Sequence, residues 1–148
     1  MKFSGNFDDN GAAQILSARQ GKSGLTTTLQ FDSADETVTG SVTDAGFVAQ
    51  IKAYRNVFSP SYPALDYEGK YKVVVPGATG VATVDALGNV TFLGTLTNGT
   101  GVSQASAVSR DGYWPFYLQR SGANETFWSW NQFTNGAVRS LPGLPSDY

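Results

Sequence analysis

The fold is decided by a short stretch that occurs twice in the chain. Its copies read Val38-Thr39-Gly40-Ser41-Val42-Thr43-Asp44 and Phe92-Leu93-Gly94-Thr95-Leu96-Thr97-Asn98. The alignment continues without a gap, so that Gln104 follows Gly94 at the same distance at which Gln50 follows Gly40. Apolar and polar residues alternate in both copies, which is the two-residue period of a strand with one buried face. We therefore expect a strand with a central glycine, then a turn and a second strand with a central glutamine.

A third and shorter copy opens the chain. The segment Phe3-Ser4-Gly5-Asn6-Phe7-Asp8 leads to Gln14 and Arg19 with one residue fewer in between. Each copy is followed by a further alternating segment that we expect to be a strand. The sequence therefore predicts related hairpin units near residues 3–31, 38–75 and 92–118.

The central glycines Gly5, Gly40 and Gly94 stand between bulky residues on the face that is expected to be buried. A glycine in a strand interior loses packing and costs entropy, so it indicates a bend or the close approach of a neighbouring element. Three such bends favour a sheet that curls and closes. The central glutamines have two interpretations, exposure to solvent or hydrogen bonding between strands.

The rest of the chain shows the same alternation, separated by Gly, Asn and Asp residues that suit tight hairpins. Helical spacing of apolar residues is found only over residues 12–19, which is too short to favour over a strand. About ten short strands at regular spacing suggest a barrel or a sandwich. We expect an all-β fold that forms a single antiparallel β-barrel, with a sandwich as the alternative, and one domain over residues 1–148.

The composition excludes several classes of function. The chain has 148 residues, no cysteine and no histidine, which removes disulfides, thiolate and imidazole metal ligands and a Ser-His-Asp triad. The formal net charge is −2 and the ten basic residues are scattered, which argues against a nucleic-acid partner. No apolar run approaches the roughly 18 residues of a membrane-spanning helix, so no membrane insertion is expected.

The carboxylates give little support to catalysis. Glu36, Glu68 and Glu125 stand in or beside expected turns, as do most aspartates. A glycosidase needs only a pair of carboxylates, which keeps a hydrolase as the third and weakest hypothesis. The acidic segments 8–11 and 32–36 have oxygen ligands for calcium, but neither matches a full calcium-binding loop. We expect no cofactor, no bound metal and no catalytic residue.

Aromatic residues are the remaining candidates for a binding site. They are dense in Tyr113–Tyr117 and Phe127–Trp130, which we expect to pair as a hairpin in which Trp128 and Trp130 share one face. Pro115 cannot donate a hydrogen bond to a ladder, so it indicates an edge strand or a bulge. These aromatics either fill the core or form a platform for a sugar, an apolar ligand or a protein. The candidate ligand-binding residues are Trp114, Tyr117, Trp128, Trp130, Tyr62 and Tyr67.

Several segments together resemble a β-rich unit found in large secreted or surface-attached bacterial proteins. They are Gly69-Lys70-Tyr71, Val74-Val75-Pro76-Gly77, Gly80–Ala86, Gly88-Asn89-Val90, Gly94-Thr95-Leu96, Gly99-Thr100, Ser109-Arg110-Asp111-Gly112 and Trp114-Pro115-Phe116-Tyr117, with Phe3-Ser4-Gly5 and Arg55-Asn56-Val57-Phe58 in the opening half. The resemblance covers residues 3 to 133 and implies an extracellular, non-catalytic module. It supplies no catalytic residues. The chain departs from that unit in Phe127-Trp128-Ser129-Trp130-Asn131, where an aliphatic strand is usual.

Together these observations predict a non-enzymatic structural or interaction module of a bacterial extracellular or surface protein. The alternative is a ligand-binding barrel for a carbohydrate or a small apolar molecule. The expected partner is accordingly a protein or a glycan. The start of the chain lacks the apolar segment of a signal peptide. A domain taken from a larger secreted chain would lack it too. The absence of cysteine is compatible with an extracellular or a cytoplasmic location.

Overall fold

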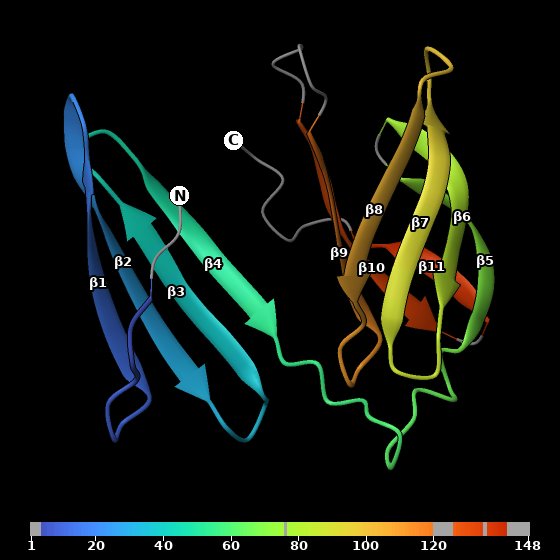
Figure 1. The fold of residues 1–148 in the computed structure, drawn as a ribbon, viewed down its shortest axis with the longest axis horizontal. Helices are drawn as coiled ribbons and strands as arrows, with labels where there is room; N and C mark the ends of the chain where they lie inside the picture. The colour runs from blue at the N-terminus through green and yellow to red at the C-terminus, as the bar shows by residue number, and fades with distance from the viewer. Residues whose placement is uncertain (1–3, 76, 120–125, 135, 142–148) are drawn as a thin grey trace. The chain divides into compact units, whose positions relative to one another are not determined.

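A computed structural model describes residues 4–75, 77–119, 126–134 and 136–141. The regular elements of these residues are all β-strands, so the predicted all-β class is confirmed (Figure 1). The strands form three antiparallel sheets. Their bounds are β1 (Ala12–Arg19), β2 (Lys22–Asp32), β3 (Thr37–Thr43), β4 (Val48–Tyr54), β5 (Gly69–Val75), β6 (Ala78–Val84), β7 (Asn89–Leu96), β8 (Gly101–Ala107), β9 (Tyr113–Gln119), β10 (Thr126–Thr134) and β11 (Ala137–Ser140).

The chain divides into two compact units, Met1–Arg55 and Asn56–Tyr148. The first unit holds one sheet in the order β1-β2-β3-β4. The second holds a sheet in the order β5-β6-β7-β8 and a three-stranded sheet in the order β11-β10-β9. The assignment of residues 1–148 to one domain stays a prediction.

The prediction of a single closed barrel is wrong for the described strands, because they belong to three separate sheets and none of these closes on itself. In the second unit the strand ladder stops between β8 and β9, at Pro115, which has no N–H to donate. Side chains of β8 make contact there instead: Gln104 Nε2 lies 3.3 Å and Ser106 Oγ 3.5 Å from the Pro115 carbonyl oxygen. The edge position predicted from Pro115 is confirmed.

The two sheets of the second unit share one apolar core, which is consistent with the sandwich alternative. Residues of β5, β6 and β7 meet aromatic residues of β9 and β10 there. The ring of Phe92 lies 5.2 Å from that of Phe116 and 6.2 Å from that of Trp114, measured between centroids. The core residues are Val73, Val75, Ala78, Ala82, Val84, Val90, Phe92, Leu96, Val108, Trp114, Phe116, Leu118 and Phe133.

The two copies of the quoted stretch pair with the strands that follow them in different registers. Gly40 lies opposite Ile51, whereas Gly94 lies opposite Val102 rather than opposite the residue that corresponds to Ile51. Because side chains alternate between two faces, an odd shift in register moves a residue to the other face. Gln104 therefore shares a face with the buried Phe92, and Gln50 lies opposite Ser41 on an exposed face.

The opening copy differs from its prediction. Residues 4–8 are not in a strand, and regular structure begins at Ala12. Phe3 lies outside the described residues. The loop instead returns onto the sheet, with Gly5 close to the Ile15 side chain and the Phe7 ring 6.1 Å from the Phe31 ring.

The close approach predicted at the central glycines is confirmed at Gly40 and Gly94. A Cβ atom added to Gly40 would overlap the carbonyl oxygen of Thr28 on the neighbouring strand. A Cβ atom added to Gly94 would overlap the carbonyl oxygen of Thr79 in the same way. Backbone lies on that side, so a side chain there would have to displace the neighbouring strand.

We predict that Gly94→Ala lowers the free energy of unfolding by about 1–3 kcal/mol, the usual cost of overpacking. The matched control is Gly101→Ala, because a Cβ atom at Gly101 would meet no atom within 4 Å. Equilibrium denaturation of both variants measures the difference. Equal loss of stability in the two variants would contradict the proposed close approach.

Candidate functional site

The structure separates the six candidate aromatic residues into three places. Trp114 lies in the core of the second unit, with none of its surface exposed. Its ring centroid is 5.8 Å from that of Phe116 and 5.6 Å from that of Phe133. Trp114 therefore fills the core and is out of reach of a ligand on the surface.

Tyr117, Trp128 and Trp130 lie together on the opposite side of the same sheet. Trp128 pairs with Tyr117 across β9 and β10, and Trp130 pairs with Pro115. This confirms the predicted hairpin pairing. Alternation places these three rings on the face turned away from Trp114 and the core. We call Tyr117, Trp128 and Trp130 the aromatic face; Tyr117 is 54% exposed, and the two tryptophans are half-buried.

Tyr62 and Tyr67 lie elsewhere, in the connection between β4 and β5. Both surround Phe58, with ring centroids 6.0 Å away, Tyr62 stacked and Tyr67 edge-on. The Tyr67 hydroxyl donates a hydrogen bond to the Arg110 carbonyl oxygen at 2.8 Å, and burial raises the pKa of this hydroxyl. These contacts tie the connection to the second unit, and they do not join the aromatic face.

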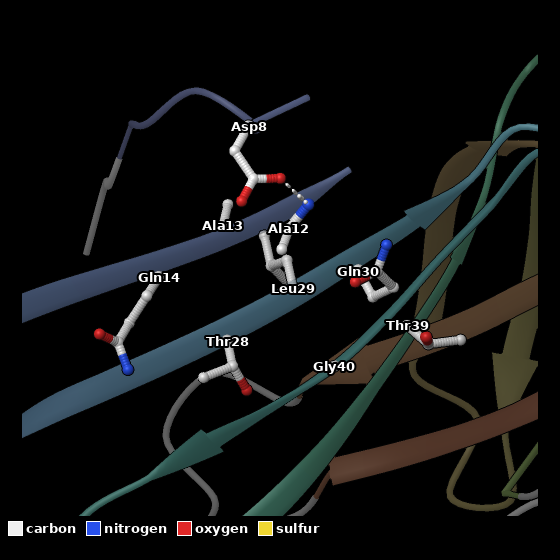
Figure 2. A pocket seen from close by; sticks show the side chains of 9 residues that line it. All are labelled: Asp8, Ala12, Ala13, Gln14, Thr28, Leu29, Gln30, Thr39 and Gly40. Atoms are coloured by element: carbon white, nitrogen blue, oxygen red, sulfur yellow. Dashed lines mark hydrogen bonds between the residues drawn. The ribbon is translucent and has the colours of Figure 1, made fainter. Parts of the chain in front are cut away.

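A hollow on the sheet of the first unit was not predicted from the sequence. It has a volume of about 430 Å³ and lies where the third strand carries Gly40 (Figure 2). We call it the Gly40 hollow. Its lining residues are Asp8, Ala12, Ala13, Gln14, Thr28, Leu29, Gln30, Thr39 and Gly40.

Some of the polar groups that line the Gly40 hollow are held in place. One carboxylate oxygen of Asp8 accepts hydrogen bonds from the backbone N–H groups of Asn10 and Ala12, at 2.9 and 2.8 Å (Figure 2 draws the second). The Gln30 amide donates to the Asn10 carbonyl oxygen at 2.9 Å. Gln14 and Thr39, by contrast, have no side-chain hydrogen bond to any described residue. The hollow needs the register of β1, β2 and β3 to bring these residues together, which the sequence does not supply.

Several of the described aspartates that stand in turns stabilise those turns. Asp8, Asp32, Asp44 and Asp85 each accept hydrogen bonds from backbone N–H groups of their own turns. Within the described residues, no group of three or more acidic side chains comes together as metal ligands. Glu36 pairs with Arg55 at 3.5 Å, and Glu125 lies outside the described residues.

Asp44 links its turn to β1. The Gly46 N–H donates to its carboxylate at 2.7 Å, and Arg19 forms an ion pair with it. The hydrogen bond from Gly46 and then that from Arg19 hold the pKa of Asp44 below its ordinary value of 3.8. The Asn89 side chain lowers the pKa of Asp85 in the same direction.

We predict that acidification below about pH 4 weakens this turn, because a group whose pKa is depressed by folding contributes stability that is lost as it becomes protonated. The unfolding free energy of Asp44→Asn should depend less on pH in that range than that of the wild type. Urea denaturation at a series of pH values between 2 and 6 measures both slopes. Identical slopes would show that folding does not lower the pKa of the Asp44 carboxyl group.

We predict that Trp114→Ala and Tyr117→Ala differ sharply in stability, although both residues lie on β9. Removing the buried indole leaves a cavity and costs about 3–5 kcal/mol. Removing the exposed phenol should change the free energy of unfolding by about 1 kcal/mol or less. Thermal and chemical denaturation compare the two variants, and a large loss in Tyr117→Ala would contradict the outward placement of the aromatic face.

Comparison with known proteins adds no evidence on function to that of these side chains. No protein-family model, curated protein or solved structure matches the chain. Across the part of the chain that is described, there is no helix of the length and hydropathy needed to cross a membrane.

Proposed function

We propose that the chain is a non-enzymatic interaction module of a bacterial extracellular or surface protein, and that it binds through the aromatic face. The observation that carries the proposal is the placement of Tyr117, Trp128 and Trp130 outside a core that Trp114 and Phe116 already fill. Tyr117 is 54% exposed on this face, and exposed aromatic side chains that gather on one face mark interaction sites. Tyrosine and tryptophan are also the residues that most often dominate binding energies.

The size of the aromatic face bears on the kind of partner. The strands β9, β10 and β11 have 7, 9 and 4 residues, and at about 3.3 Å per residue and 4.8 Å between strands they cover roughly 300 Å². A stable protein–protein interface buries about 800 Å² on each partner. The face by itself therefore suits a weak, transient protein contact or a small ligand better than a permanent protein interface.

A carbohydrate is the second candidate, because Trp128 and Trp130 lie two residues apart on one face of β10. This spacing separates the indoles by about 7 Å along the strand, which allows two neighbouring sugar rings to pack their C–H groups on aromatic surfaces. The original alternative placed such a ligand inside a barrel. Because side chains fill the core, we place a carbohydrate ligand on the outer face of the sheet instead.

A carboxylate-based hydrolase has the least support. A glycosidase needs a carboxylic acid with a raised pKa as its proton donor. Asp44 and Asp85 have lowered pKa values, and both serve their own turns. The buried side chains that surround Trp114 are mainly apolar, which gives a proton-transfer pair no place in the core.

We predict that titration with a panel of neutral oligosaccharides changes the intrinsic tryptophan fluorescence, because two of the three tryptophans lie on the aromatic face. Tyr117→Ala retains all the tryptophans and should weaken binding by roughly 10-fold or more, as expected for a central aromatic contact. A fluorescence change that Tyr117→Ala leaves unaltered would exclude the aromatic face as the binding surface.

The matched control for this titration is Leu93→Ala. Leu93 is also a large exposed side chain on an outer face of the second unit, but it lies on β7, in a different sheet. It should bind as the wild type does. No fluorescence change with any oligosaccharide would remove the carbohydrate candidate.

A further inference from the structure

We propose that the Gly40 hollow is a second binding site, for one uncharged and hydroxyl-rich ring such as a single sugar unit. The proposal does not depend on the aromatic face, because every residue that lines the hollow belongs to the first unit.

The floor of the hollow is backbone. Ala13, Leu29 and Gly40 lie in one row across β1, β2 and β3, and their side-chain positions alternate onto the other face. The rows on either side carry the polar residues: Gln14 and Thr28 on one side, Gln30 and Thr39 on the other. A ligand would thus rest on strand backbone between two rows of hydrogen-bonding side chains, which Figure 2 labels.

These side chains offer the donors and acceptors that hydroxyl groups use. The amide of Gln14 both donates and accepts, and so does the hydroxyl of Thr39. Neither forms a side-chain hydrogen bond to the described chain, whereas Asp8 and Gln30 are anchored by the turn at Asn10. A partly fixed set of groups reduces the entropy that binding must otherwise cost.

The charge around the hollow favours an uncharged ligand. Among the described residues that line it, Asp8 alone is charged. Lys52 lies opposite Thr39 in the neighbouring strand, and so on the same face of the sheet, with its ammonium 5.2 Å from the Tyr54 ring centroid. One carboxylate and one nearby ammonium give this region no net charge to select an anion or a cation.

The volume of about 430 Å³ lies within the range of small-molecule sites, but the hollow is open to solvent on one side. Open sites bury little of a ligand, so the expected dissociation constant is in the millimolar range, corresponding to about −4 kcal/mol. This strength fits a single ring that is one unit of a longer chain.

A hollow in the second unit provides an internal comparison. It has about 500 Å³ and lies over the row Val73, Gly80 and Gly94, the corresponding place of its own four-stranded sheet. Its walls combine exposed Val74 and Val81 with Lys72, Thr79 and Thr95, and none of the described residues that line it carries an amide or carboxylate side chain. If a hollow over strand glycines were sufficient, both hollows would bind sugars. A requirement for amide and carboxylate groups predicts binding at the Gly40 hollow only.

The test is NMR titration of the uniformly ¹⁵N-labelled full chain with D-glucose, D-galactose, D-mannose and N-acetyl-D-glucosamine in turn. We expect one of these sugars to shift the side-chain amide of Gln14 and the backbone amides of Thr28, Thr39 and Gly40. Signals of Val74 and Val81 should remain in place. Gln14→Ala should weaken binding about 2- to 10-fold, the loss of one net hydrogen bond.

The matched control is Gln50→Ala. Gln50 lies on the same face of the sheet, opposite Ser41, but does not line the hollow. It should bind sugar as the wild type does. The proposal is overturned by an absence of shifts at about 100 mM of every sugar, roughly a hundred times the expected dissociation constant. It is equally overturned by shifts of the same size at Val74 and Val81, or by shifts that Gln14→Ala leaves unchanged.

The outcome also separates this proposal from the proposed function. Sugar binding at the Gly40 hollow is read from Gln14, whereas binding at the aromatic face is read from Tyr117→Ala and tryptophan fluorescence. Shifts confined to β9 and β10 would overturn the proposal for the hollow and support the aromatic face. Shifts confined to residues around Gly40 would support the proposal for the hollow, and the oligosaccharide titration would still decide the aromatic face.

Discussion

The strict alternation of side chains between the two faces of a strand is the constraint on which the rest of this structure depends. On β9 it sends Trp114 and Phe116 into the core and Tyr117 to the outer surface. On β1 it places Gln14 beside the Gly40 hollow and Ile15 on the other face. A shift of one residue in register would exchange these roles, and with them both candidate binding surfaces.

The alternation of side chains leads to different amounts of burial in the two units. In the second unit two sheets meet, and their inner faces form a core with fully buried aromatic rings. Among the described residues of the first unit, only Leu25 and Thr27 are buried. A single four-stranded sheet removes less apolar surface from water, so each apolar residue of the first unit contributes less to stability.

Turns and close approaches fix the registers. Aspartates such as Asp44 and Asp85 accept backbone hydrogen bonds within their own turns, which sets where each hairpin reverses. Gly40 and Gly94 allow neighbouring backbones to approach where any side chain would overlap a carbonyl oxygen. Both features were evident from residue types alone, because Asp suits turns and Gly suits close backbone contact whatever the remote surroundings.

The sequence by itself determined the all-β class, the strands β1, β3, β4, β7, β8, β9 and β10, the pairing of β9 with β10 and the edge position of Pro115, since these depend on local periodicity and turn chemistry. Only the tertiary structure decided that the sheets stay separate, that Gln104 turns inward while Gln50 turns outward, and that Trp114 is core whereas Tyr117 is surface. The Gly40 hollow likewise needs three strands in one register. Periodicity shows that two faces exist, but which face is covered depends on contacts between residues far apart in the chain.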